Sequence, residues 1–278
     1  MSLDSVPIWV LLLATIGLVV LALEAGVRLG RRRQLRAGGK SEVSGAMVGA
    51  TMALLAFMLA FTFNGAAGRH DARKGLVIEE ANAIDKTWLR AGFLAEPYRT
   101  EIRGLLRNYV DVRVKAAAGT LDLGQAAHQS EALHDSMWAM AEEVGRKDVG
   151  SITTGLFIQA LNEVIDLHLK RVTVGIRNRV PPTIWATLYL LMFAGMVMMG
   201  TQIGLSGTRH IGMELALALS FSVVLFVIAD LDRPQEGLIN VSQKAMQELQ
   251  TRLNARGPRL REGQSPDPPN TPQVEQVK

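Results

Sequence analysis

Four long stretches without a charged residue decide what this chain can fold into. They span residues 6–23, 43–68, 180–208 and 215–229. The core of a bilayer is about 30 Å thick, and roughly 20 apolar helical residues are needed to cross it. Because backbone N–H and C=O groups in hydrocarbon must pair within their own segment, each stretch is predicted to be a membrane-spanning helix. The fourth stretch is short, so its helix is expected to begin earlier, near Gly212.

Composition and charge exclude several classes of function. The net charge of +4 is too small to indicate a nucleic-acid-binding protein. The chain contains no cysteine, which excludes disulfides, zinc thiolate sites and thiol catalysis. The first apolar stretch is preceded by Asp4 and by no Lys or Arg, so it is predicted to be a retained membrane helix and not a signal peptide.

The predicted architecture is an all-α, multi-pass membrane protein. A helical extramembrane bundle is inserted between the second and third of four transmembrane helices, because apolar residues recur there at three- and four-residue spacing. The polar, Pro-rich C-terminal segment is predicted to be disordered. The predicted segments are a transmembrane hairpin over 1–68 (helices near 6–27 and 43–65, basic loop 28–40), the bundle over 69–179, a second transmembrane hairpin over 180–234, an amphipathic helix over 235–256 and the disordered tail over 257–278.

The distribution of basic residues bears on the orientation in the membrane. The loop over 28–40 holds six Lys or Arg and no acid, and the positive-inside rule places such a loop in the cytoplasm. Seven basic residues lie at the membrane-facing ends of the bundle. These seven are Arg69, Arg73, Lys74, Lys170, Arg171, Arg177 and Arg179. The opposite side of the membrane also has seven, namely the six of the loop and Arg209 between the third and fourth membrane helices. Long domains count less in this rule, so the sequence favours a non-cytoplasmic bundle.

No pattern of residues typical of catalysis or metal binding is found. The five His match neither HExxH nor a Cys/His cluster, and a structural or solvated role is expected for them. No Gly-rich phosphate loop follows a strand, and no GxSxG is present. We therefore expect no enzyme activity, no catalytic residue, no cofactor and no bound metal.

The second apolar stretch carries the candidate functional residues. Small residues and then aromatic residues repeat every four positions at Gly45, Gly49, Ala53, Phe57 and Phe61. The small residues would let another helix approach closely, which favours a helix-packing seam. Alternatively, several copies could point this face at a shared axis, where rings of Phe57 and Phe61 would form a hydrophobic constriction that gates by dewetting.

The layout and three stretches of sequence resemble the bacterial bestrophin-like membrane proteins, a family whose function is largely unassigned. The first stretch is 54–90, LLAFMLAFTFNGAAGRHDARKGLVIEEANAIDKTWLR. The second is 180–185, VPPTIW, and the third is LDRP at 231–234, followed by Val241-Ser242. The resemblance extends from residue 6 to residue 246 and implies a multi-pass protein of the bacterial inner membrane.

A more distant similarity links the second helix to the true bestrophins. Phe61, Asn64, Ala66 and Arg69 fit the F-x-x-N-x-A-x-x-R spacing of that family. The resemblance implies a pentameric ion channel whose neck is lined by the second helix, and it makes Phe57, Phe61 and Asn64 the pore-lining candidates. It also implies a cytosolic helical domain, which is the opposite of what the basic loop predicts.

Two hypotheses for the function follow. The first is a homo-oligomeric ion (anion) channel in the lipid bilayer, built around the second transmembrane helix. The alternative is a non-conducting membrane sensor, scaffold or partner-binding protein that acts through its helical domain. They differ in whether the face from Gly45 to Phe61 is turned to a shared axis or buried within one protomer.

Overall fold

The computed structural model of the protein describes residues 7–37, 45–233 and 237–256. Every regular element within these ranges is a helix, which confirms the all-α class. In chain order they are α1 (Ile8–Ala37), α2 (Gly45–Ala91), α3 (Tyr98–Ala117), α4 (Leu123–Lys147), α5 (Ile152–Val172), the π-helical turn η2 (Thr173–Arg177), α6 (Pro182–Ser206), α7 (Ile211–Asp232) and α8 (Lys244–Arg256). Residues 38–40 of the predicted loop and the predicted disordered tail, 257–278, lie outside the described residues.

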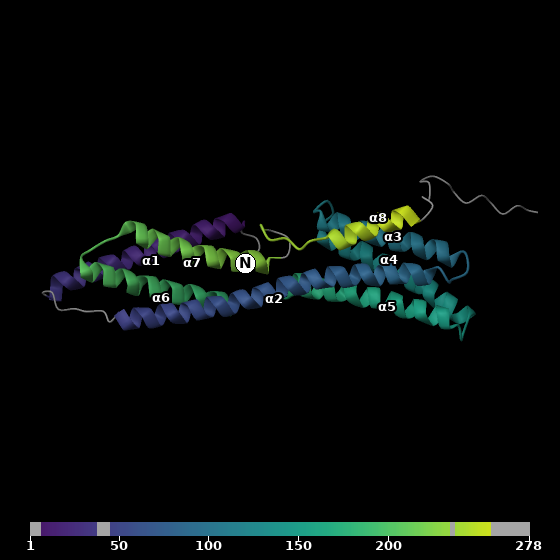
Figure 1. Ribbon diagram of the computed structural model, residues 1–278, viewed down its shortest axis with the longest axis horizontal. Helices are drawn as coiled ribbons and strands as arrows, with labels where there is room; N and C mark the ends of the chain where they lie inside the picture. The colour runs from purple at the N-terminus through teal and green to yellow at the C-terminus, as the bar shows by residue number, and fades with distance from the viewer. Residues whose placement is uncertain (1–6, 38–44, 234–236, 257–278) are drawn as a thin grey trace, which may run out of the picture.

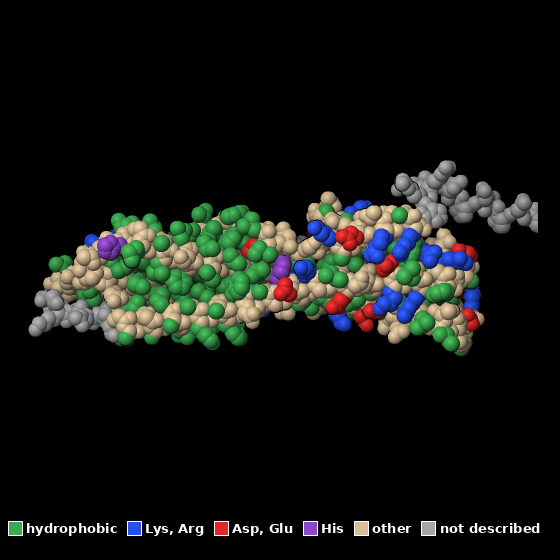
Figure 2. All heavy atoms as spheres, viewed as in Figure 1, with side chains coloured by type: hydrophobic (Ala, Val, Ile, Leu, Met, Phe, Trp, Pro, Cys, Tyr) green, Lys and Arg blue, Asp and Glu red, His purple; other side chains and the backbone are tan. Residues whose placement is uncertain are grey.

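The helices form an elongated molecule with an apolar half and a charged half. α2 runs through both halves (Figure 1). In the apolar half α6 and α7 pack on α2, and α1 packs on α6 and α7. In the charged half α3, α5 and α8 pack on α2, and α4 lies against α3 and α5. Figure 2 shows hydrophobic side chains over the surface of the first half, while Lys, Arg, Asp and Glu gather over the second.

The apolar half is built to be embedded in a membrane. α1, α2, α6 and α7 are each long and apolar enough to cross a bilayer. The rest of the chain buries at most 33% of the most apolar 18-residue window of each of these helices. Lipid is the medium that covers so much apolar surface, because soluble proteins rarely expose large apolar patches. The four predicted apolar helices are therefore confirmed, and α7 begins at Ile211, one residue before the predicted start.

The first membrane helix is longer than predicted. α1 ends at Ala37 and not near residue 27, so most of the predicted basic loop is helical. Arg is a good helix former, and the ion pair of Glu24 with Arg28, at 3.1 Å, supports the extension by an i,i+4 contact. The prediction was wrong because it took the end of the apolar stretch for the end of the helix.

Four glycines bring α1 and α6 into contact through their backbones. Gly26 and Gly30 of α1 face Gly200 and Gly204 of α6, and a Cβ on any of the four would overlap backbone atoms of the facing helix. Close approach of this kind is a main source of attraction between helices in lipid, where van der Waals contact replaces the hydrophobic effect. This pair of G-x-x-x-G segments is therefore the packing seam of the membrane half.

The seam predicted from the sequence lies on α2, where Gly45 and Gly49 have the same spacing. Within the protomer these glycines do not pack closely: a Cβ on Gly49 would meet nothing within 4 Å, and one on Gly45 would meet the side chain of Gln202 at 3.3 Å. Ala53 is also exposed. The reason is that α2 has no facing glycine pair in register, whereas α1 has one on α6. Packing of Gly45, Gly49 and Ala53 against another copy stays a prediction.

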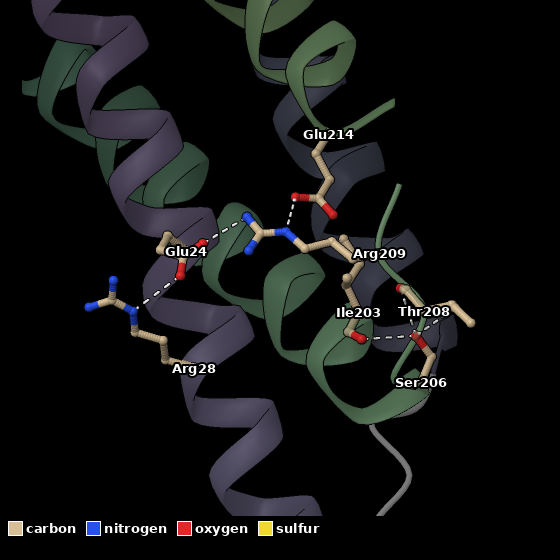
Figure 3. Close-up of polar contacts among 7 residues, drawn as sticks. All are labelled: Glu24, Arg28, Ile203, Ser206, Thr208, Arg209 and Glu214. Atoms are coloured by element: carbon tan, nitrogen blue, oxygen red, sulfur yellow. Dashed lines mark hydrogen bonds and ion pairs between the residues drawn. The ribbon is translucent and has the colours of Figure 1, made fainter. Parts of the chain in front are cut away.

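An ion-pair cluster joins α1, α7 and the connection between α6 and α7 at the end of the membrane half far from the bundle (Figure 3). Arg209, in the connection between α6 and α7, lies 2.7 Å from Glu24 of α1 and 3.1 Å from Glu214 of α7. Glu214 is only 9% exposed, and a carboxylate next to an apolar stretch is costly without such a partner. The cluster therefore explains how an acid is tolerated in the first turn of α7.

Capping residues and a single apolar core define the bundle. Asp122 caps α4 by accepting hydrogen bonds from Gly124 N and Gln125 N, and Ser151 caps α5 by accepting from Thr154 N. α8, within the predicted amphipathic segment 235–256, completes the core. The fully buried residues include Ile84, Leu106, Met137, Phe157, Leu161, Met246 and Leu249.

The stability of the membrane half is predicted to depend most on the contact at the glycine seam. In Gly200→Leu the new side chain must displace the α1 backbone, and overpacking costs about 1–3 kcal/mol even where side chains can adjust. We expect a clear fall in the thermal unfolding midpoint of the purified protein in detergent. Gly17→Leu, the same exchange at an open and exposed position of α1, should leave the midpoint nearly unchanged. Equal midpoints for the two variants would contradict the seam.

Candidate functional site

One face of α2 is left uncovered along nearly the whole helix. Phe57 and Phe61 expose 66% and 68% of their surface. They belong to a row of residues that recurs with the helical period on that face. The exposed members of this row, named here the α2 stripe, are Ala46, Ala50, Ala53, Phe57, Phe61, Asn64, Gly68, Asp71, Glu79, Asn82 and Lys86. The stripe is apolar in the membrane half and polar beside the bundle.

The three pore-lining candidates all lie on the α2 stripe. Phe57 and Phe61 are one helical turn apart, and Asn64 is exposed less than one turn further on. The protomer does not bury the face that runs from Gly45 to Phe61, so the packing seam is not realised inside one copy. Next to the stripe, α2 and α7 form an apolar hollow of about 500 Å³ whose lining includes Phe63 and Phe221.

Arginines of α2 hold the end of α7 at the boundary between the two halves. Arg73 donates to the carbonyls of Leu231 at 2.9 Å and Asp232 at 3.0 Å. These are carbonyls of the last turn of α7, which have no partner inside the helix and carry the negative end of its dipole. Arg69 lies 3.3 Å from the Asp232 carboxylate, which also accepts from the backbone N–H of Val180 at 3.0 Å. The three stretches that carry the family resemblance therefore meet at one joint.

The neighbouring acid fixes the path of the chain toward α8. Asp230 is 1% exposed, and its two carboxylate oxygens accept from Leu238 N and Ile239 N, each at 2.9 Å. Backbone N–H donors stabilise the ionised form of a buried carboxylate, so the acid needs no cation of its own. The two Asp of the LDRP segment thus have separate tasks: Asp232 joins α7 to α2 and α6, and Asp230 directs the C-terminal segment.

A buried polar cluster lies at the centre of the bundle, and each of its four long helices contributes to it. Glu80 of α2 is 0% exposed and pairs with Arg113 of α3, with Nε at 3.4 Å, and with Arg171 of α5. It also accepts a hydrogen bond from Tyr109 of α3. A buried charge is tolerated only when it is paired and hydrogen-bonded, and Glu80 meets both conditions.

Two histidines complete the cluster. His134 of α4 and His168 of α5 have ring centroids 4.9 Å apart, and His134 lies 4.7 Å from the Tyr109 ring. His168 Nδ1 is 3.1 Å from the Tyr109 hydroxyl. Among the described residues, neither Nε2 has a hydrogen-bond partner, and no group of three or more His, Cys, Asp or Glu could hold a metal ion.

Burial controls the ionisation of these groups. Desolvation lowers the pKa of His134 from its ordinary value of 6.5 to about 4, and it does the same to the pKa of His168. Burial, together with the nearby Glu80 carboxylate, raises the pKa of Tyr109 well above its ordinary value. Both histidines are therefore neutral at pH 7, and the cluster can hold four helices together but offers no ionised histidine for acid–base chemistry.

This cluster is not among the sites predicted from the sequence, although one signal for it is present there. Glu80 shares a helical face with Val77, Ile84 and Trp88, all of which are buried. An ionisable residue on the apolar face of a helix must find a partner in the core. The partner could not be named, because Tyr109 and His168 are distant in sequence and lie on different helices.

The histidines predict a pH dependence of stability. In the unfolded chain they bind protons below about pH 6.5, whereas the folded pKa values are about 4, so the free energy of unfolding falls as the pH is lowered through that interval. The loss by pH 5 is about 2 kcal/mol per histidine, since both side chains are only 5% exposed. The charged groups that surround them are Glu80, Arg113, Arg171 and Asp135.

A matched variant separates this effect from the titration of carboxylates. In His134→Gln/His168→Gln the other titrating groups are retained, so its thermal midpoint should fall less between pH 7 and pH 5 than that of the parent. Both proteins are compared in the same detergent and buffers. Identical pH profiles would show that the two rings are not buried as neutral groups.

Comparisons with known proteins agree with this architecture. The family model described as a bestrophin-like domain matches residues 11–246. The crystal structure of a membrane protein shares the fold at a TM-score of 0.63 and 14% sequence identity, with 89% of this chain and 97% of that chain covered. No curated protein sequence matches the chain. Because the family model covers most of its length, the chain belongs to the bestrophin-like family of membrane proteins.

Proposed function

We propose that this protein is a homo-oligomeric ion channel in which the α2 stripe of each copy faces a shared axis. The observation that carries the proposal is the stripe itself, which stays exposed from the membrane half to the bundle, where Lys86 at its end pairs with Glu163 of α5 at 2.7 Å. The protein then acts by conduction and not by catalysis. The similarity of the second helix to the true bestrophins supports the same arrangement.

The polar members of the stripe are difficult to explain if it faces lipid. Asn64 is exposed on the apolar part of α2, and an amide without a partner in hydrocarbon costs several kcal/mol, of the order of 4–8 on a cyclohexane scale. At a water-filled axis the same amide is hydrated. Asp71 and Glu79 continue the stripe beyond the membrane half, where they would lie in the wider, aqueous part of the path.

The aromatic members of the stripe form the gate in this proposal. Phe57 and Phe61 from several copies would give two stacked apolar rings, and a hydrated ion crosses such a constriction only after losing water. The similarity to true bestrophins implies an anion as the permeant species. Asp71 and Glu79 favour a cation, because acidic rings attract cations. Flux of chloride and of potassium through the same liposomes distinguishes the two.

The gate is tested by truncating both rings. In Phe57→Ala/Phe61→Ala the constriction is wider and wetter, so ion flux through purified protein in liposomes should rise at least severalfold. Phe193→Ala is the matched control, since Phe193 is 44% exposed on α6 and lies outside the stripe. A double variant that is folded, assembled and as silent as the parent would leave the non-conducting sensor or scaffold as the function.

Assembly has its own test. Gly45→Leu/Gly49→Leu places bulk on the exposed side of α2 without disturbing the protomer, because neither position meets backbone of another helix. The oligomer seen by light scattering in detergent should become smaller if copies meet along this side. An oligomer of unchanged mass would place the contact elsewhere.

The orientation completes the proposal: the basic end of α1 in the cytoplasm and the bundle on the opposite side. The absence of cysteine gives a clean background for labelling. Arg36→Cys near the end of α1 should react with a membrane-impermeant maleimide only after the cells are opened. Glu131→Cys on the exposed side of α4 should react in intact cells. The reverse pattern would place the bundle in the cytoplasm.

A further inference from the structure

We propose that the bundle contains a binding site for an organic anion, a carboxylate or phosphate group on an apolar body. The site is a hollow of about 380 Å³ next to the boundary with the membrane half. Arg73 of α2, Arg113 of α3 and Arg171 of α5 all line it. The proposal concerns binding alone and does not depend on conduction.

The charge around the hollow is unbalanced. Three guanidinium groups line it, and among the described residues the carboxylate that pairs with two of them is Glu80. Arg73 contributes its two terminal nitrogens to backbone carbonyls, which carry no net charge. The Asp232 carboxylate also attracts Arg73, but Arg69 pairs with it at 3.3 Å. Four positive charges against two negative charges leave an excess of two. A partly enclosed site with this excess attracts an anion, because interactions between charges strengthen where water is excluded.

The terminal nitrogens of Arg113 indicate the same ligand. Its Nε is buried and lies 3.4 Å from Glu80 Oε1 in the ion pair described above, and the buried Nε of Arg73 has no hydrogen-bond partner among the described residues. Arg73 is only 5% exposed and both of its terminal nitrogens bind carbonyls, so it contributes its charge to the hollow. An oxyanion can accept from several guanidinium N–H groups at once. The polar contact of Arg113 within the described chain is the one with Glu80, which leaves its terminal nitrogens available.

The other walls of the hollow define the rest of the ligand. Leu76, Val77, Leu123, Val172 and Val241 line it together with several alanines. Ligand sites combine such apolar walls with a few convergent polar groups that fix the orientation. An inorganic ion would leave these walls unused. The site is therefore matched to an amphiphile whose head group meets the arginines and whose body meets the apolar walls.

The segment before α8 closes the hollow on one side. Asn240 and Gln243 line it, and Gln243 accepts from Arg171 at 3.5 Å, a long contact that a charged ligand could replace. This segment follows the residues that Asp230 binds. A ligand in the hollow would thus touch α2, which passes into the membrane, and the segment that leads from α7 to α8.

The experiment uses the full chain in a neutral detergent and octyl phosphate as the probe. Isothermal titration calorimetry should show saturable binding, and the thermal midpoint should rise with probe concentration. Octanol, which lacks the charge, should bind at least tenfold more weakly, and so should inorganic phosphate, which lacks the apolar body. Equal affinity for octanol would overturn the proposal, as would the absence of saturable binding of octyl phosphate.

Two variants locate the binding. Arg113→Gln removes a guanidinium and should weaken octyl phosphate binding at least tenfold. Because this change also leaves Glu80 with one basic partner fewer, Ala127→Leu is the second variant: it fills the hollow and leaves every charge in place. It should abolish binding while the protein without ligand keeps its thermal midpoint. Arg146→Gln, on the exposed surface of α4, is the control. Parental affinity in a folded Ala127→Leu protein would place the probe elsewhere and overturn the proposal.

Lipid and soluble anions are distinguished in nanodiscs. If phosphatidylglycerol discs suppress octyl phosphate binding and phosphatidylcholine discs do not, a lipid head group occupies the hollow. If both discs permit binding, the natural ligand is a soluble organic anion. Both results support the site, provided that Ala127→Leu still prevents binding. Binding that survives Ala127→Leu in discs of either composition would overturn the proposal.

Discussion

The capping of α7 by arginines of a different helix is the interaction on which the rest of the structure depends. A helix that ends at the boundary of the membrane leaves carbonyls unpaired in its last turn, and in α7 two carboxylates lie beside them. Arg69 and Arg73 come from α2, and Arg179, from the segment before α6, donates to Asp232 O at 3.0 Å. Without these cations the end of α7 would be a buried negative charge, which costs about 3–5 kcal/mol when a partner is removed.

The joint matters because it places the membrane half relative to the bundle. α2 by itself would connect the two halves through a single helix. The joint adds contacts between α2, the end of α7 and the segment that leads into α6. α2 has 47 residues and is therefore about 70 Å long at 1.5 Å per residue. Its uncovered stripe keeps one direction through both halves. This is the geometry on which the proposed pore depends.

Much of the fold could be predicted from sequence, because the strongest signals are local. Four uncharged stretches are recognised by length alone, and apolar residues at three- and four-residue spacing mark the helices of the bundle. The predicted end of α1 was wrong, because hydropathy marks where the chain leaves the lipid and not where the helix ends. The glycine pair that begins at Gly26 and the one that begins at Gly45 have the same spacing. Which of them forms the packing seam depends on the helix that faces it, and the spacing does not reveal that helix.

The site was predictable only in part, for a related reason. Phe57, Phe61 and Asn64 were selected from a pattern along one helix and are exposed, and their place in a pore stays a prediction. Glu80, Tyr109 and His168 could not be grouped, because contacts between distant helices leave no periodic trace in sequence. The arginine-lined hollow is harder still: Arg113 and Arg171 look like ordinary surface charges until the bundle is assembled.

α8 has a consequence for the order in which the chain is made. Its residues Met246, Leu249 and Leu253 are almost fully buried in the bundle core, yet they follow the last membrane helix in sequence. A ribosome releases α3, α4 and α5 well before α8 exists, so the bundle must wait with an open apolar groove until α7 has been inserted. Completion of the bundle therefore reports that the membrane part is in place. A chain stalled during insertion would expose that groove to chaperones and proteases, which gives the cell a means to recognise it.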